Sequence, residues 1–184
     1  MASAFSHAIV AWAIGKAVPM RELTTPTLAV GMACSILPDL DVVGFHFGIQ
    51  YGDLWGHRGL SHSILFAVVL SGVLVTLGYR KRTAAAKLVL FTYFFLSTAS
   101  HGLLDACTNG GLGVAFFSPF DPTRYFFPMR PVLVSPLGVG EFFTGYGWQV
   151  LLSEVLWLWL PAGCFVLVCR QLDRISAADV ERAS

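Results

Sequence analysis

Five apolar segments separated by short polar stretches constrain this chain of 184 residues more than any other feature. They are Ala2–Val18, Leu23–Leu37, Ser61–Tyr79, Ala84–Asp105 and Trp148–Cys169. A helix needs about 20 apolar residues to cross a bilayer, and only structures that satisfy their own backbone hydrogen bonds can do so. Charged residues make up 12% of the chain, whereas about a quarter is usual in a soluble domain. We therefore predict an all-α, multi-pass membrane helical bundle of about five transmembrane helices, with residues 1–184 forming a single domain.

The basic residues predict how this bundle is oriented, because Lys and Arg concentrate in cytoplasmic loops. They form three clusters, each near the end of an apolar segment: Lys16 with Arg21, Arg80–Arg82, and Arg170 with Arg174. The three clusters share one side of the membrane only if the N-terminus lies outside and the C-terminus lies in the cytoplasm. Residues 171–184 then form a short cytoplasmic tail, either as a polar helix or as a frayed end.

Charge and cysteine content argue against several classes of protein. The net charge is only +1, and the aromatic residues are not interleaved with basic ones, so no nucleic-acid partner is expected. The first positive charge, Lys16, follows the N-terminal apolar run, so a cleaved signal peptide is not expected either. The cysteines show neither CxxC nor framework spacing and are interpreted as structural. They are Cys34, Cys107, Cys164 and Cys169.

Metal-ligand side chains gather at the predicted outer ends of the segments. The full set is His7, Asp39, Asp41, His57, His62, His101 and Asp105. Lys and Arg alone define the orientation, yet it brings all of these groups to one face of the membrane. Imidazoles and carboxylates bind zinc, manganese and iron in proteins. We therefore predict a divalent metal centre, with zinc favoured over manganese or iron, and with two ions favoured over one.

His101 and Asp105 form the sharpest motif, because residues four apart on a helix share a face and can converge on one ion. Alternatively, Asp105 accepts a hydrogen bond from His101 and only orients it.

His57 and His62 flank the start of the third segment, where Ser61 is expected to cap the helix. Arg58 between them is a candidate anion clamp, because a guanidinium group matches phosphate or carboxylate oxygens.

Two acidic positions have several interpretations. Pro38 is expected to end the second helix, so that the chain turns outward and presents Asp39 and Asp41. Asp39 is the favoured ligand of the two. Glu154 lies six residues after Trp148, about 9 Å into the fifth segment at 1.5 Å per residue, where a carboxylate needs a partner. Ligand, general base and structural hydrogen bond are all open for it.

A long outer connection over residues 106–147 is rich in Phe, Tyr and Pro. Loops of such length in compact proteins are usually functional, and aromatic rings favour the membrane interface. We expect this loop, and its aromatic part Phe116–Phe127 in particular, to roof the metal site.

At these residues the chain resembles the YdjM-like family of bacterial inner-membrane, metal-dependent hydrolases. The similarity spans nearly the whole chain and is carried by Ser6–His7, Leu37–Asp41, His57–Ser63, His101–Asp105, Ser118–Pro128 and Leu151–Glu154. The resemblance implies metal-dependent hydrolysis in the bacterial inner membrane, and the orientation predicted from Lys and Arg makes the site face the periplasm. In ligand chemistry alone, the pattern is also similar to that of the zinc phospholipase C and nuclease group.

The expected reaction is cleavage of a phosphoester, or of an ester or amide, in a membrane lipid or lipid-linked substrate. Arg58 and Arg124 would stabilise the developing negative charge, and Glu154 is the candidate general base. The alternative is a non-catalytic metal-binding membrane protein, either a transporter, a sensor or a structural partner whose metal locks the helices together. No protein partner can be named from the sequence.

Overall fold

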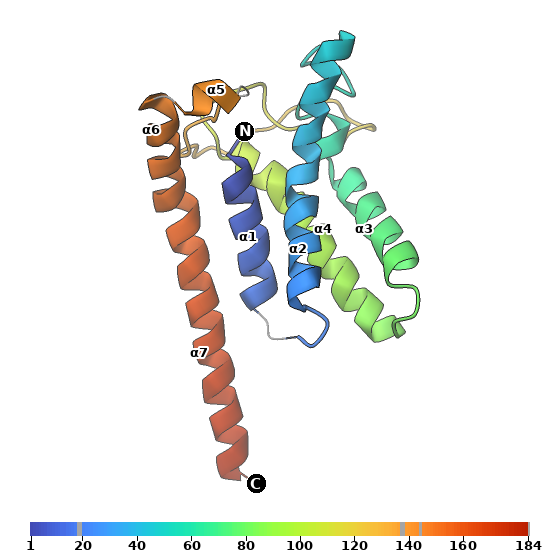
Figure 1. Cartoon of the computed structure of the whole chain (residues 1–184), viewed down its shortest axis with the longest axis vertical. Coiled ribbons are helices and arrows are strands. Elements are labelled where there is room, and N and C mark those ends of the chain that lie inside the picture. Colours follow the sequence, from blue (N-terminus) through green and yellow to red (C-terminus); the bar gives the residue numbers. More distant parts are fainter. Residues whose placement is uncertain (18–19, 137–138, 144, 184) are drawn as a thin grey trace.

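The computed structural model describes residues 1–17, 20–136, 139–143 and 145–183. Its helices are α1 (Ala4–Ala17), α2 (Thr25–Ile36), α3 (Ile64–Gly78), α4 (Ala84–Ala106), α5 (Val139–Phe142), α6 (Gly145–Glu154) and α7 (Leu160–Ala183). Two 3-10 segments, η1 (Leu37–Phe47) and η2 (Leu60–His62), and a π-helical turn, η3 (Val155–Trp159), complete the regular structure. Within the described ranges, extended pairing is confined to two isolated bridges. Figure 1 shows the long helices side by side, which confirms the predicted all-α membrane bundle.

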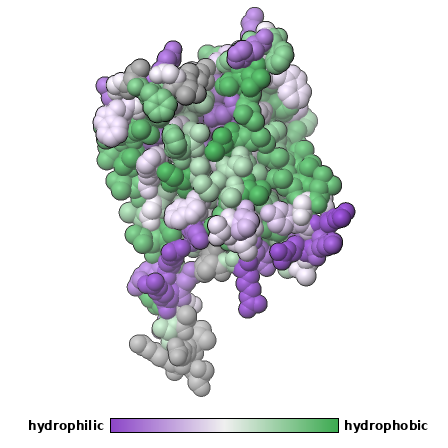
Figure 2. Space-filling view, in the orientation of Figure 1, coloured by the Kyte–Doolittle hydropathy of each residue, from purple (hydrophilic) through white to green (hydrophobic). Residues whose placement is uncertain are grey.

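Three helical runs in the described part of the chain are long and apolar enough to cross a membrane: Thr25–Phe47, Ala84–Ala106 and Gly145–Ser176. Helices α1 and α3 have only 14 and 15 residues. At 1.5 Å per residue each is about 22 Å long, shorter than a hydrocarbon core of about 30 Å. The number of crossings and their orientation therefore stay predictions, and the expected end of the first segment at Val18 lies outside the described residues. Figure 2 shows the hydrophobic band on one face, between more hydrophilic ends.

The α-helix α2 ends at Ile36, next to the boundary predicted at Pro38, but the expected outward turn is absent, and that part of the prediction was wrong. Leu37 keeps helical backbone angles, with φ −53° and ψ −39°, and the chain continues without a turn as η1. A proline is tolerated in the first turn of a helix because its missing N–H would have no partner there. The tightening from α to 3-10 geometry at Leu37 provides such a first turn. Asp39 and Asp41 are consequently carried on a helical segment.

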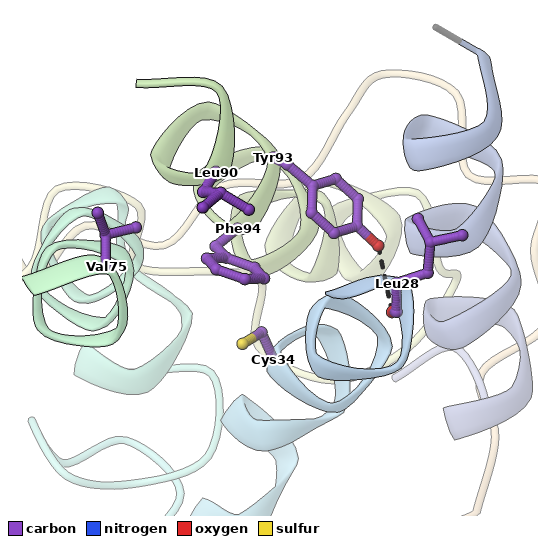
Figure 3. Close-up of a cluster of buried hydrophobic side chains, with 6 residues drawn as sticks. All are labelled: Leu28, Cys34, Val75, Leu90, Tyr93 and Phe94. Atoms are coloured by element: carbon purple, nitrogen blue, oxygen red, sulfur yellow. Dashed lines mark hydrogen bonds between the residues drawn. The ribbon is translucent and has the colours of Figure 1, made fainter. Parts of the chain in front are cut away.

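The apolar core lies where α2, α3 and α4 meet (Figure 3). Tyr93 of α4 is its polar member, and the hydroxyl donates to the carbonyl oxygens of Leu28 at 3.2 Å and of Ala11 at 3.3 Å. Gly31 in α2 allows this approach, because a Cβ atom there would overlap the Tyr93 ring. A side chain on α4 thus joins α1 to α2 and fixes α1, α2 and α4 relative to one another. Cys34 packs in the same cluster as a small apolar group.

Residues 107–136 cross the end of the bundle at which the N-terminus lies (Figure 1). Backbone hydrogen bonds hold this segment down: Phe127 N–H donates to Ala106 O at 3.0 Å, and Ser135 N–H donates to Met1 O at 2.8 Å. Val114 and Val132 are its buried apolar anchors. The segment therefore packs as part of the fold, although it contains no long helix or strand.

Candidate metal centre

Four buried side chains direct their ligand atoms toward one another. Asp39 comes from η1, His62 from η2, and His101 and Asp105 from adjacent turns of α4. Because α2 and α3 both pack against α4, the segment after α2 and the segment before α3 reach the same part of α4. The four ligand atoms lie within 4.8 Å of one another, and no member is more than 7% exposed. We call these four residues the α4 group.

The separations within the α4 group fit a single ion. Ligands about 2.0–2.1 Å from a tetrahedral zinc ion lie about 3.3 Å from one another. The Nε2 atoms of His62 and His101 are 2.9 Å apart. Oδ1 of Asp39 lies 3.2 Å from Nε2 of His101 and 3.7 Å from Nε2 of His62. Oδ2 of Asp105 lies 3.8 Å and 3.5 Å from the same two nitrogens. Shifts of about half an ångström would therefore admit an ion.

The carboxylates of the α4 group have lone pairs to spare. Both oxygens of Asp39 are buried without a hydrogen-bond partner, and Oδ2 of Asp105 accepts no hydrogen bond but forms an ion pair with Arg58 Nε at 3.1 Å. The other oxygen of Asp105 accepts from the Ala2 amide at 2.7 Å, which leaves Oδ2 as the available ligand atom. A buried acceptor without a partner costs about 1–3 kcal/mol, and more when it is charged. A cation among these oxygens would remove that cost, so the α4 group could bind a metal ion.

The two histidines of the α4 group are held in place by polar contacts at Nδ1, the ring nitrogen that faces away from the other ligands. Nδ1 of His101 lies 2.6 Å from the carbonyl oxygen of Ser35, and Nδ1 of His62 lies 3.0 Å from Ser61 Oγ and 3.2 Å from Oδ2 of Asp41. A ring N–H donates in these contacts, so we assign the Nδ1–H tautomer and an unprotonated Nε2 for the ion-bound state. Histidine ligands almost always donate their second N–H in this way, which fixes the ring.

Asp41, His57 and His62 form a second group whose ligand atoms also lie within 4.8 Å of one another. Oδ1 of Asp41 lies 2.7 Å from Nδ1 of His57. Its Oδ2 accepts from the Ser61 hydroxyl at 2.6 Å and from the Arg58 amide at 3.3 Å. In contrast to Asp39, Asp41 is therefore already hydrogen-bonded through both oxygens. A second ion at this position would have to replace some of these bonds.

His7 lies against the α4 group. Its ring stacks on His101, with centroids 3.7 Å apart and an interplanar angle of 16°. Nε2 of His7 is 3.6 Å from Oδ1 of Asp105, and both ring nitrogens are buried without a hydrogen-bond partner. Two readings of His7 are compatible with this placement: an additional ligand to an ion in the α4 group, or a ring that packs against His101.

Arg58 is fully buried, and its backbone is left-handed with φ +62°. Nε lies 3.1 Å from Oδ2 of Asp105, and the terminal nitrogens donate to Thr108 Oγ1 at 3.0 Å and Gly110 O at 2.8 Å. The guanidinium group thus compensates the charge of Asp105 and fastens the chain after α4. An anion would have to share these donors, so the clamp role predicted for Arg58 stays a prediction.

Arg124 holds the turn that carries His57. Its guanidinium nitrogens donate to the carbonyl oxygens of His57 and Tyr51, both at 3.0 Å. The guanidinium carbon also lies 5.7 Å from the centre of the Tyr51 ring. Unlike Arg58, Arg124 is only partly buried, so part of its charge is accessible.

Glu154 finds its partners at the start of α1. Its carboxylate is fully buried and accepts hydrogen bonds from the amide and the hydroxyl of Ser3. The π-helical turn η3 follows directly and brings Trp159 Nε1 to 2.8 Å from Ser6 Oγ. These contacts fit the structural alternative for Glu154. Ser3, the partner of Glu154, directly follows Ala2, whose amide donates to Asp105.

The charge state of His62 follows from these surroundings. Burial lowers its pKa, but the carboxylates of Asp105, Asp39 and Asp41 outweigh burial and raise the pKa of His62 to about 10. Without a cation the ring therefore carries a proton at neutral pH. An ion and this proton compete for the same nitrogen.

Ser61 does not cap the third helix, so this prediction was wrong. The α-helix begins only after the 3-10 turn η2, and Ser63 is the capping residue, whose hydroxyl accepts from Phe66 N at 3.0 Å. Ser61 instead donates to Asp41. Sequence reasoning also missed the Ser35 carbonyl and Thr108. A backbone carbonyl has no side-chain signature, and Thr108 lies outside every motif.

Comparison with known proteins places this chain in a family. The sequence model described as YdjM inner membrane protein matches residues 1–175. The Inner membrane protein YbcI of Escherichia coli (strain K12) is 37% identical over 161 residues, which cover 88% of this chain and 92% of that protein. No solved structure matches the chain.

Proposed function

Since this chain belongs to the YdjM inner membrane protein family, we propose that it is a membrane-embedded, metal-dependent hydrolase with its metal centre in the α4 group. One observation carries the proposal: four buried ligand atoms lie within 4.8 Å of one another, and both oxygens of Asp39 among them accept no hydrogen bond. Its proposed substrate is a membrane lipid or a lipid-linked compound, cleaved at a phosphoester or at an ester or amide bond.

The donor set of two imidazoles and two carboxylates favours zinc, with manganese and iron as alternatives. A bound ion supplies a Lewis acid for a phosphoryl or carbonyl oxygen and lowers the pKa of water. His101 and His62 hold their rings in place through Ser35 and Asp41. The side chains of Asp39 and Asp41 retain 8% and 6% exposure, whereas those of His101 and Asp105 retain none. Access to the centre is therefore proposed from the η1 side.

The charged residues around the centre have separate proposed roles. Arg58 is a positioning residue that balances Asp105 and holds the chain after α4. Arg124 keeps part of its charge accessible beside His57, which supports the stabilisation of negative charge on a substrate. Glu154 positions Asp105 indirectly, because it fixes Ser3 and thereby the neighbouring amide of Ala2.

A periplasmic orientation of the centre is part of the proposal. The α1–α2 and α3–α4 turns lie at the end of the bundle away from the N-terminus (Figure 1). Lys16 lies in the last turn of α1 and residues Arg80–Arg82 lie in the α3–α4 turn, and basic residues favour the cytoplasm. A green fluorescent protein fused after Ser184 should fluoresce, because it folds in the cytoplasm. A fusion protein that is present at full length in the membrane but does not fluoresce would contradict this orientation.

Metal content tests the centre directly. Detergent-purified protein should carry zinc, measured per chain by elemental analysis, and His101→Ala should lose the ion held by the α4 group. His46→Ala is the matched control, because it removes a histidine of η1 that is outside both ligand groups. Wild-type protein that stays metal-free after incubation with zinc, manganese and iron would refute the centre.

Turnover tests the reaction. Vesicles of phosphatidylethanolamine and phosphatidylglycerol containing the wild-type protein should release a cleavage product, and those containing the His101→Ala variant should not. Release of equal amounts of product by the wild-type protein and by His101→Ala would contradict metal-dependent hydrolysis.

The burial of the α4 group favours a second candidate, a structural metal that locks the helices together. Four protein ligands and near-complete burial are typical of closed structural sites. In that case zinc removal lowers the thermal unfolding temperature, and the metal-loaded protein shows no turnover. The hydrolase requires turnover that returns when zinc is restored.

A further inference from the structure

An apolar groove of about 450 Å³ runs beside the α4 group. One wall is the first turn and a half of α3, and the other is the turn over residues 116–120 of the outer segment. Its lining residues are Ile64, Leu65, Val68, Phe116, Phe117, Ser118 and Phe120. All but Ser118 are apolar, and Ser118 is itself buried. The groove is therefore suited to a hydrocarbon rather than to a polar ligand.

The two walls are fixed to each other and to the α4 group by the backbone. Ile64 lies two residues after His62, and its N–H donates to Phe116 O at 3.0 Å. The adjoining residue, Ala115, donates to Arg58 O at 3.0 Å. Residues that hold or flank the centre thus also set the width of the groove.

Only a thin layer separates the groove from the centre. Gly102 follows His101 in α4, and a Cβ atom there would lie 3.2 Å from the Phe116 ring and 2.9 Å from His62 O. The Phe116 ring therefore rests on the turn of α4 that carries His101. On its other side, the same residue lines the groove. A chain in the groove would end next to the centre.

Exposed apolar side chains on both walls of the groove indicate which kind of molecule fills it. Phe120 is 84% exposed, Phe117 is 52% exposed, and Val68 on the opposite wall is 40% exposed. In an inner membrane protein, exposed apolar side chains that lie together mark a surface in contact with lipid. A lipid lying along α3 would have its acyl chain between these walls and its polar end toward His62.

We infer that this groove is an acyl-chain subsite, which holds the hydrocarbon chain of a membrane lipid with its headgroup at the α4 group. The inference rests on the proposed function, which it deepens by naming the part of the substrate that is recognised. Binding in the groove does not itself require hydrolysis, so the two proposals can fail separately.

Two neighbouring valines on α3 provide a matched pair of variants. Val68 lines the groove, whereas Val69 is 53% exposed and does not line it. Val68→Trp should fill the groove, and Val69→Trp adds the same bulk to the helix outside it. Both substitutions place an indole on an exposed apolar surface, so they should insert and fold alike.

Photolabelling measures where the acyl chain lies. The full-length protein is reconstituted in vesicles of phosphatidylethanolamine and phosphatidylglycerol that contain phosphatidylglycerol with a diazirine in its acyl chain, and labelled residues are mapped by mass spectrometry. Labelling of Leu65 and Phe116, normalised to Leu88 on α4, should exceed that of Val69, because the groove retains lipid. Val68→Trp should lose most of this labelling, and Val69→Trp should retain it.

The outcomes separate the two proposals. Equal labelling in the two tryptophan variants, or groove residues labelled no more than Val69, would overturn the acyl-chain subsite. Groove labelling that Val68→Trp removes would support the subsite even in a protein that shows no turnover. In that case the hydrolase proposal fails while the lipid-binding site stands.

Discussion

Asp39 and Asp41 are two residues apart and chemically identical, yet the structure predicts different effects on metal binding when each is replaced. Asp39→Asn and Asp41→Asn are the informative pair, because both remove one charge from η1 and keep the side-chain shape. Both oxygens of Asp39 lack a hydrogen-bond partner and one lies 3.2 Å from Nε2 of His101. Those of Asp41 bind His57, Ser61 and the Arg58 amide. Asp39 therefore has the contacts of a ligand, and Asp41 those of a residue that orients His62.

The expected changes in zinc binding follow from these two roles. Loss of a partner that orients a metal-bound histidine typically weakens affinity about 10–100-fold, which corresponds to about 1.4–2.8 kcal/mol. Asp41→Asn should therefore bind the same number of ions as the wild type, with an affinity lower by about this factor. Asp39→Asn removes one of the four ligands of the α4 group and should abolish stoichiometric binding there.

The assay is a zinc titration of metal-depleted protein in competition with a chelating dye, which gives both affinity and the number of ions. Two results would refute the reasoning. An unchanged affinity in Asp39→Asn would remove Asp39 from the centre. A loss of one ion per chain in Asp41→Asn would make Asp41 a ligand and support the expectation of two ions.

Three further predictions concern proton competition and the supports of the centre. Because the pKa of His62 is raised to about 10, a zinc ion must displace its proton to bind. Zinc affinity should therefore fall about tenfold for each pH unit below that value. Zinc titrations at about pH 6 and about pH 8 test this, and equal affinities at the two pH values would contradict it. In the metal-free protein the same proton stabilises the fold below the ordinary pKa of histidine, and this contribution is lost as the pH rises through about 10. Glu154→Gln should lower the free energy of unfolding by about 1–3 kcal/mol, because one carboxylate oxygen that accepts from Ser3 becomes a donor. Metal stoichiometry should be unchanged, and loss of the ion would instead make Glu154 a ligand. Tyr93→Phe removes the hydroxyl that donates to carbonyl oxygens of α1 and α2. The free energy of unfolding, measured by thermal unfolding, should fall by about 0.5–1.5 kcal/mol, and zinc affinity should be unchanged.

The boundaries of the elements show where local reasoning failed. A proline usually ends an α-helix, and α2 does end at Ile36, but the chain then tightens into η1, with Pro38 in its first turn, instead of turning outward. Ser61 and Ser63 are both good capping residues. The intervening turn η2 decides between them, because it moves the start of α3 to Ile64.

The sequence by itself determined that the chain lies in a membrane and which residue types could form the site: its long apolar segments and few charges predict a bundle of membrane helices, and His and Asp residues, which can bind metals, lie at the ends of these segments. Only the tertiary structure decided which of those groups meet. Asp39, His62 and His101 come from three segments far apart in the chain, and they meet because α2 and α3 pack on the same helix, α4. The difference between Asp39 and Asp41, the partner of Glu154 and the groove beside His62 all depend on contacts between segments distant in sequence. Local patterns do not encode such contacts, because each is fixed by the packing of whole helices rather than by the residues on either side.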